Sequence, residues 1–442
     1  MADASNHGST ESSDRLVAPF VTMRRVVILA MLSIAGWFLF WPAETPAPPS
    51  GPHDLVLIAS DRIERLSFSP DGRRLLMGMP VTAVIWDVQN GDVLRSFRDS
   101  DYSVMEIATF SPDGRSIVTK PANTALLFDA ETGARLASFA GHERALQSAA
   151  FSPDSRRLIT SSLDETVRIF DADRLQPPST WFSSVETRSP TVTLGRRGNV
   201  ENAIFSPDGK RVLILARLGG VAELIDTDSW QSIALLRAER GDMRQATFTP
   251  DGRRVLTLSA SRVQTWSADD GRLLLDLRPG PASVFFQRAA VSPDSRRIAT
   301  VGANARITLW DAETGRALTT TAAGDALLTG LSFSPDGRRF ATTSTDGTVQ
   351  LWDAETASAL TRLPGAAERA ANPVFSPDGH RLAASFSAKR GTFSDDVTRI
   401  WPLRDAAPYH DPALATVVRR EHRALDEWIV ARYRLARRRL GL

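Results

Sequence analysis

A tetrapeptide that recurs eight times constrains this chain more than any other feature of its sequence. Most copies read Ser-Pro-Asp-Gly, with threonine once in the first position and serine twice in the last. Successive copies lie 42, 41, 54, 43, 43, 42 and 42 residues apart. A steady period of this length indicates an array of small structural units rather than a row of independent domains. The copies begin at Ser69, Ser111, Ser152, Ser206, Thr249, Ser292, Ser334 and Ser376.

Each unit carries a second landmark further on, which is an apolar residue that aspartate usually follows. Between the landmarks apolar and polar residues alternate, as at 348–352, which is the period of a strand. Asp346-Gly347 is typical of a hairpin, and Pro-Asp-Gly is typical of a tight turn. Each unit therefore predicts four short strands joined by turns. The landmarks are Trp86-Asp87, Phe128-Asp129, Phe170-Asp171, Ile225-Asp226, Trp266-Ser267, Trp310-Asp311, Trp352-Asp353 and Trp401-Pro402.

This pattern resembles the WD-repeat (WD40-type) β-propeller family, in which four-stranded antiparallel blades surround a channel. The resemblance covers residues 54–404 and is best at 331–356. It implies an all-β fold with eight blades, seven being the alternative. A strand expected over Leu55 to Ile58 would complete the last blade and close the ring, which removes open sheet edges.

The sequence departs from the family in the polar residues that its blades share. The family's Gly-His dipeptide occurs once, at His142. Its buried tetrad of histidine, serine or threonine, aspartate and tryptophan is complete in no unit. The third unit has Asp164 but Phe170 in place of tryptophan, and the seventh has Asp346 and Trp352 without histidine. We therefore expect the blades to pack mainly through apolar faces.

The N-terminal region predicts a membrane anchor. Residues 1–22 are polar and expected to be disordered, and 23–41 contain an apolar run from Val26 to Trp41. Sixteen helical residues span about 24 Å, short of the roughly 30 Å hydrocarbon core, but flanking arginines and tryptophans extend the reach. The alternative is a cleaved signal peptide. Small residues suited to cleavage are missing after the run, which favours an uncleaved signal anchor.

Charge predicts which way this anchor points. Arg24 and Arg25 precede the run and Arg62 is the first basic residue after it, so the N-terminus is expected in the cytoplasm. Residues 42–53 form a proline-rich linker that carries the propeller into the exported compartment. Of 53 basic residues only three are lysine, a bias that favours a bacterial source. The expected location is a single-pass protein of the bacterial inner membrane with a periplasmic propeller.

The third unit contains the one insertion in the array, near residues 174–197. Trp181 and Phe182 within it are candidate anchors for a protein partner, because exposed aromatic residues often carry binding energy. The alternative is a tolerated loop whose aromatic side chains fold back on the blade edge.

The last segment, 405–442, predicts a basic amphipathic helix whose apolar positions include Trp428. It is expected to contact anionic lipid or a partner, or alternatively to pack on the propeller with its arginines in solvent. Residues 411–442 carry a net charge of +4 and the whole chain +2, so the remainder sums to −2. This excludes a basic nucleic-acid-binding body, and no nucleic-acid partner is expected.

The composition points to binding rather than to chemistry. Without cysteine the chain has no thiolate metal site and no cysteine nucleophile, and one aspartate per turn is too few to bind calcium. No catalytic, cofactor or metal-binding residue is predicted. The expected function is a non-catalytic, membrane-anchored scaffold for protein partners.

Two alternatives to the scaffold remain open. One is an exported enzyme or small-ligand binder that uses the central channel. The stretches Asp129 to Gly133 and Asp311 to Gly315 resemble the repeat motif of quinoprotein dehydrogenases, but the tryptophan that ends that motif is missing, as is the GxSxG of a hydrolase. The other alternative is a sensor that signals through its anchor to a separate partner.

Overall fold

The computed structural model describes the repeat body of the chain. The described residues are 55–59, 62–80, 82–98, 105–173, 186–195, 199–216, 219–238, 243–279, 285–363, 365, 369–387 and 396–403. The segments predicted over 1–22, 23–41, 42–53 and 405–442 lie outside them, so the anchor, the linker and the C-terminal helix stay predictions. Within the described part, no helix is long and apolar enough to cross a membrane.

The described residues form eight antiparallel sheets of four strands, one of which gains a fifth strand. Blades one and two contain β2 (Arg65–Phe68), β3 (Arg74–Gly78), β4 (Thr82–Asp87) and β5 (Val93–Arg98), then β6 (Met105–Phe110), β7 (Ser116–Pro121), β8 (Ala125–Asp129) and β9 (Arg135–Phe139). Blades three and four contain β10 (Leu146–Phe151), β11 (Arg157–Ser162), β12 (Thr166–Asp171) and β14 (Val192–Gly195), then β15 (Val200–Phe205), β16 (Arg211–Ala216), β17 (Val221–Asp226) and β18 (Ser232–Arg237).

The second half of the ring repeats the arrangement. Blades five and six contain β19 (Met243–Phe248), β20 (Arg254–Ser259), β21 (Val263–Ser267) and β22 (Leu273–Leu277), then β23 (Phe286–Val291), β24 (Arg297–Gly302), β25 (Arg306–Asp311) and β26 (Ala317–Ala322). Blade seven contains β27 (Leu328–Phe333), β28 (Arg339–Ser344), β29 (Val349–Asp353) and β30 (Ala359–Leu363). Blade eight contains β31 (Ala370–Phe375), β32 (Arg381–Ser387), β33 (Asp396–Pro402) and β1 (Leu55–Ile58).

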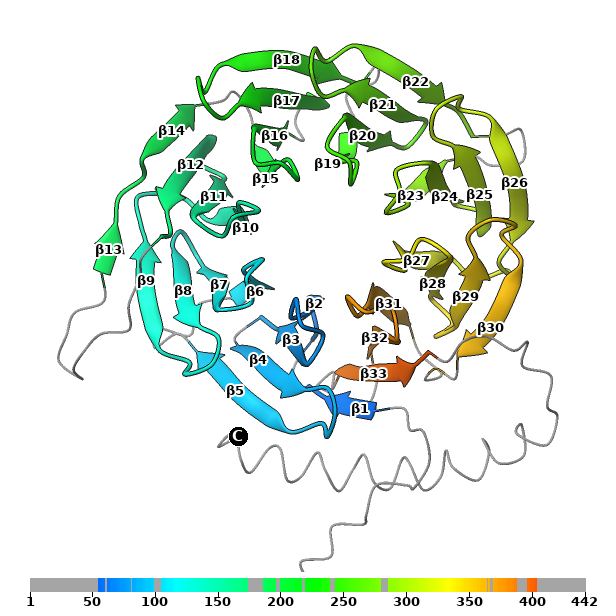
Figure 1. The fold of residues 1–442 in the computed structure, drawn as a ribbon, viewed down its shortest axis with the longest axis horizontal. Coiled ribbons are helices and arrows are strands. Elements are labelled where there is room, and N and C mark those ends of the chain that lie inside the picture. Colours follow the sequence, from blue (N-terminus) through cyan, green and yellow to red (C-terminus); the bar gives the residue numbers. More distant parts are fainter. Residues whose placement is uncertain are drawn as a thin grey trace, which may run out of the picture. The chain divides into compact units, whose positions relative to one another are not determined.

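The blades form a ring, with the first strand of each blade innermost and the fourth outermost around the central axis (Figure 1). This confirms the predicted eight-bladed propeller and excludes the seven-bladed alternative. Because neighbouring strands are antiparallel, the first-to-second and third-to-fourth turns lie at one end of every blade. We call that end the turn face. The second-to-third hairpins and the connections between blades lie at the other end, the connection face.

The ring closes as the sequence predicts. Strand β1 pairs antiparallel with β33, from Leu55 opposite Ile400 to Ile58 opposite Val397. A side chain also crosses this junction, since Arg381 Nη1 of blade eight donates to the carbonyl oxygen of Gly72 in blade one at 3.4 Å. The first and last strands of the ring therefore share one sheet.

Apolar contacts hold each blade to the next. Eight buried hydrophobic clusters each combine residues of two neighbouring blades, one cluster for every junction. At the junction of blades six and seven, Trp352 packs with Ile307 and Leu309 of the preceding blade. The prediction that the blades pack through apolar faces is confirmed.

The insertion in the third unit adds a strand to the neighbouring blade. Strand β13 (Glu186–Arg188) pairs parallel with β9, from Glu186 opposite Ala137 to Arg188 opposite Phe139. The chain then returns as β14, the outermost strand of blade three. Part of the insertion thus covers the outer edge of blade two. The candidate anchors Trp181 and Phe182 lie outside the described residues.

Candidate functional site at the channel mouth

The repeated tetrapeptide builds the turns between first and second strands. In blade four, Ser206 Oγ donates to Asp208 Oδ1 at 2.6 Å and accepts from the N–H of Arg211 at 2.9 Å. Burial alone would raise the pKa of Asp208, but hydrogen bonds from Ser206 and from the N–H of Lys210 outweigh it and lower that pKa. The carboxylate of Asp208 therefore stabilises the turn in which it lies.

An arginine that begins the second strand links neighbouring blades on this face. Arg74 Nη2 donates to the carbonyl oxygen of Gly114 in the next blade at 3.0 Å, and Arg157 Nη2 donates to that of Gly209 at 3.2 Å. The residue before this position is exposed and basic in all eight blades, histidine being the eighth. These residues are Arg73, Arg115, Arg156, Lys210, Arg253, Arg296, Arg338 and His380.

Polar residues gather at the opposite, connection-face end of the inner strands. In seven blades the pairing of the first two strands shifts register there, as between Phe286 and Arg288 in blade six. A β-bulge of this kind re-aims the side chains beside it. The shifts lie in the first half of the first strand in each of these blades, so they alter the lining of one mouth of the channel.

A pocket of about 370 Å³ opens at this mouth between blades six, seven, eight and one. That volume lies within the roughly 300–1,000 Å³ of sites that hold small ligands. Polar and apolar side chains share its wall. The lining residues are Glu64, Arg65, Leu66, Arg288, Thr329, Gly330, Leu331, Asn372, Pro373 and Val374.

Two arginines give the pocket its charge. Arg65 is exposed to solvent, and desolvation by the neighbouring protein atoms lowers its pKa. The guanidinium of Arg65 has no hydrogen-bond or ion-pair partner among the described residues. Arg288 donates from Nε and Nη1 to the carbonyl oxygens of Thr329 and Gln287 at 3.2 and 3.3 Å. The carboxylate of Glu64 contacts Arg62, whose Nη2 lies 2.6 Å from Glu64 Oε1.

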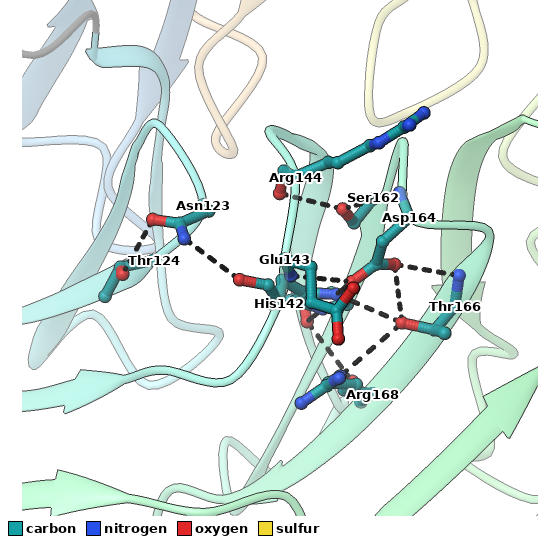
Figure 2. A network of polar contacts seen from close by, with 10 residues as sticks. Asn123, Thr124, His142, Glu143, Arg144, Ser162, Asp164, Thr166 and Arg168 are labelled. Atoms are coloured by element: carbon teal, nitrogen blue, oxygen red, sulfur yellow. Dashed lines mark hydrogen bonds and ion pairs between the residues drawn. The ribbon is translucent and has the colours of Figure 1, made fainter.

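A second polar cluster is buried inside blade three (Figure 2). His142 has a fully buried side chain, with Nδ1 2.8 Å from Asp164 Oδ2 and Nε2 2.8 Å from Thr160 Oγ1. Its backbone oxygen accepts from Asn123 Nδ2 of blade two at 2.9 Å, which ties the two blades together. Since Nδ1 faces a carboxylate, it carries the proton, and Nε2 accepts from the threonine hydroxyl.

The pKa values in this cluster follow from burial and hydrogen bonding. Burial lowers the pKa of His142 more than the neighbouring Asp164 raises it, so the ring is neutral at pH 7. Burial alone would raise the pKa of Asp164, but hydrogen bonds from Thr166, His142 and the N–H of Glu143 outweigh it and hold that pKa far below its usual range. With all its polar atoms engaged internally, the cluster stabilises the blade rather than presenting a reactive group.

Three other blades contain the tryptophan half of the same network, which sequence analysis missed. Trp352 Nε1 donates to Thr342 Oγ1 at 2.8 Å, and blades five and six repeat the pair. The threonine is the fourth residue of the second strand. In blades one and eight that position holds Met77 and Ala384. The indole nitrogens of Trp86 and Trp401 are buried and have no hydrogen-bond partner among the described residues.

None of the predicted contact residues is among those that the structure describes. Trp181, Phe182 and Trp428 all lie outside the described residues, so their contacts stay predictions. In the part of the chain that the structure describes, no three histidine, aspartate or glutamate side chains are grouped as metal ligands would be. The channel pocket was not predicted residue by residue, because it depends on which blades become neighbours and on bulges with no sequence signal of their own.

Comparison with known proteins agrees with the repeat and the fold. Residues 133–171 and 316–353 match the family described as WD domain, G-beta repeat. A comparison with curated protein sequences finds no match. The solved structure of the Dos1 propeller is 14% identical and aligns with a TM-score of 0.64, covering 80% of this chain and 95% of its own.

Two further solved structures share the arrangement. The C-terminal WD40 domain of Sif2 is 13% identical with a TM-score of 0.63, covering 79% of this chain and 99% of its own. The computationally designed protein Ika8 is 18% identical with a TM-score of 0.62, covering 78% of this chain and 98% of its own. At these identities the likeness shows the fold alone.

Proposed function

We propose that this WD-repeat β-propeller is a non-catalytic scaffold for protein partners, anchored in a membrane by the segment Val26 to Trp41. WD40 propellers are commonly protein-interaction scaffolds. The main support for this proposal is that the aspartates with lowered pKa form hydrogen bonds within the fold. Aspartates with lowered pKa, such as Asp208 and Asp353, close their own turns, and Asp164 serves the buried cluster. A catalytic group would instead be expected in a cleft, poised for substrate.

The topology of the ring supports a particular orientation for the scaffold. The described chain enters the ring at Leu55 on the turn face, where a side chain at Gly91, in a third-to-fourth turn, would collide with it. The ring ends on the same face, where the N–H of Leu403 donates to the carbonyl oxygen of His380 at 2.6 Å. Both ends of the described ring therefore lie on the turn face, and the proposed site for partners is the connection face.

The remaining parts of the proposal follow from the sequence. The arginines before the apolar run favour a cytoplasmic N-terminus and a periplasmic propeller in a bacterial inner membrane. The basic segment 405–442 is proposed to contact anionic lipid or a partner.

Photocrosslinking of the full chain in the cells that make it tests the scaffold. A crosslinking residue replaces Asn304 or Thr345, which are exposed at connection-face hairpins of blades six and seven. Matched controls replace Glu313 and Glu355, exposed at turn-face turns of the same blades. Discrete protein adducts from the first pair alone are expected. Adducts from neither pair, or only from the controls, would contradict a partner on the connection face.

An alkaline phosphatase fusion at the C-terminus tests the compartment independently. An active fusion is expected, because the enzyme functions only when exported. An inactive fusion would place the propeller in the cytoplasm without affecting the scaffold role.

A second candidate function is a small-ligand binder that uses the channel. The pocket between blades six, seven, eight and one favours it, because a polar concave site of this volume is of the size that ligands occupy.

A further inference from the structure

We propose that the pocket at the connection-face mouth of the channel binds an oxyanion, a carboxylate or phosphate group, through the guanidinium groups of Arg65 and Arg288. This goes beyond the scaffold role, since a ring that bound no protein would still present the site. Three features of the described residues carry the inference: uncompensated charge, the shape of the wall and the position of the arginines on their strands.

The charge of the pocket is positive and lacks a counterion. The guanidinium of Arg65 has no partner among the described residues. Both bonds of Arg288 go to neutral carbonyl oxygens, so its charge is unpaired in the same part of the chain. The carboxylate of Glu64 already contacts the guanidinium of Arg62, which offsets its charge. Two guanidinium groups therefore face the pocket with no acid of its lining left to neutralise them.

The energetics favour an anion over water. Enclosure by protein lowers the pKa of Arg65, which means that the surroundings penalise its positive charge. An oxyanion offsets that penalty through charge-assisted hydrogen bonds, which are stronger than bonds to neutral acceptors. The planar guanidinium matches the two oxygens of a carboxylate or phosphate, a geometry that a lysine would not offer.

The wall is shaped to admit a ligand. Thr329 and Asn372 add neutral polar groups, and Leu66, Leu331 and Val374 supply apolar surface. A mix of apolar wall and a few convergent polar groups is typical of ligand sites. Gly330 lies in this wall, and a side chain there would collide with Pro373 of the next blade. Glycine at this position allows blades seven and eight to approach where they form the pocket.

The two arginines occupy equivalent positions on their strands. Each stands four residues before the serine that begins its tetrapeptide, Ser69 or Ser292. Each also pairs with the fifth residue of its second strand, Gly78 or Val301, and the register shift of blade six lies before this position. Because side chains alternate along a strand, the shared position presents Arg65 and Arg288 to the same pocket.

Titration calorimetry on the full chain in detergent tests the proposal. The probes are inorganic phosphate, citrate and a short acetylated tetra-aspartate peptide, each added at constant ionic strength against chloride. The pocket variants are Arg65→Gln and Arg288→Gln. Matched controls are Arg73→Gln and Arg296→Gln, which remove an exposed arginine from the turn face of the same two blades.

At least one probe is expected to bind, with its Kd raised tenfold or more by each pocket variant and less than twofold by each control. Tighter binding of the peptide would identify a segment of a partner protein as the source of the oxyanion, and tighter binding of phosphate or citrate a free metabolite. Either outcome supports the site. If no probe binds, or if the pocket variants and controls bind alike, the proposal is wrong.

A conservative variant distinguishes loss of binding from loss of folding. Arg65→Lys keeps the charge but not the planar pair of donors, so we expect it to fold with the wild-type thermal midpoint and to bind severalfold more weakly. If Arg65→Gln unfolds the ring, Arg65→Lys and Arg288→Gln still decide the matter. Unchanged binding in both would overturn the proposal.

Discussion

Blades three and seven contain complementary halves of one hydrogen-bond network. Blade three has histidine, aspartate and threonine joined through His142, with Phe170 fully buried in the place of tryptophan. Blade seven has the indole of Trp352 on Thr342, and Asp346 in its hairpin has no histidine to accept from. Both blades pack with the same apolar contacts at their junctions. Each half of the network is therefore sufficient for a blade, and neither is required by the ring.

The same comparison extends around the ring. Blade four has apolar residues at both positions, Ile214 and Ile225, and is buried as completely as the others. Blades one and eight keep tryptophan, whose indole nitrogen has no acceptor in the described part of the chain. A buried donor without a partner costs about 1–3 kcal/mol. The polar positions therefore adjust the stability of single blades, while the apolar junctions hold the fold.

The largest expected effect is at Asp164. Asp164→Asn removes the charged acceptor that orients His142 and leaves buried donors poorly matched, which should lower the free energy of unfolding by about 2–4 kcal/mol. The matched control is Asp346→Asn, at the same hairpin position in blade seven, with an expected loss of about 1 kcal/mol. Urea unfolding of the two variants gives the comparison. Equal losses would mean that the histidine half contributes nothing specific to blade three.

Tryptophan replacement tests the other half. Trp352→Phe removes the bond to Thr342, and Trp401→Phe removes a similar volume where the indole nitrogen has no partner. We expect the first to cost about 1–2 kcal/mol more than the second, because only the first breaks a buried hydrogen bond. Hydrogen exchange on peptides of blades seven and eight measures the two blades separately. A greater loss in blade eight would contradict the assignment.

Supplying the missing acceptor should stabilise blade eight. Ala384→Thr places a hydroxyl where blades five, six and seven have one, next to Trp401, and is expected to raise the free energy of unfolding by about 1 kcal/mol. Ala384→Val adds nearly the same volume without the hydroxyl and is the control. The thermal midpoints of the two variants differ only if the indole gains its partner, so equal midpoints would refute the expectation.

The smallest expected effect is a pH dependence in blade three. His142 is neutral in the folded blade because burial lowers its pKa below the usual 6.5, so the unfolded chain binds a proton that the folded chain lacks. Stability contributed by the neutral ring is present above pH 6.5 and is lost as the pH falls, by about 0.7 kcal/mol or less between pH 7 and pH 6. His142→Gln should remove this slope from urea unfolding measured across that range. A slope that survives the substitution must come from other groups.

Much of the fold could be predicted because its signals are local. The Pro-Asp turns, the alternating strands and the apolar strand at Leu55 to Ile58 each depend on a few adjacent residues, and their repetition gave the number of blades. The partial networks were harder, because Thr342 and Trp352 meet only when two strands pair in a particular register.

The pairing of β13 with β9 and the channel pocket depend on contacts between residues that are still further apart in the sequence. Residues 186–188 add to a blade that the chain has already completed, which no period in the sequence indicates. Arg65 and Arg288 are 223 positions apart in the sequence and line one pocket only because the ring closes. Such contacts between distant segments are not encoded in any one repeat.

The pairing of β1 with β33 has a consequence for how the chain is made. Strand β1 leaves the ribosome about 340 residues before its partner, an interval of roughly 17–70 s at about 5–20 residues per second. During that time the apolar strand Leu-Val-Leu-Ile has no partner strand within its own chain. An unpaired strand of this kind can pair with strands of other chains instead. A nascent chain that stalls before residue 396 therefore exposes β1 as an unpaired strand, and only synthesis of β33 allows the ring to close.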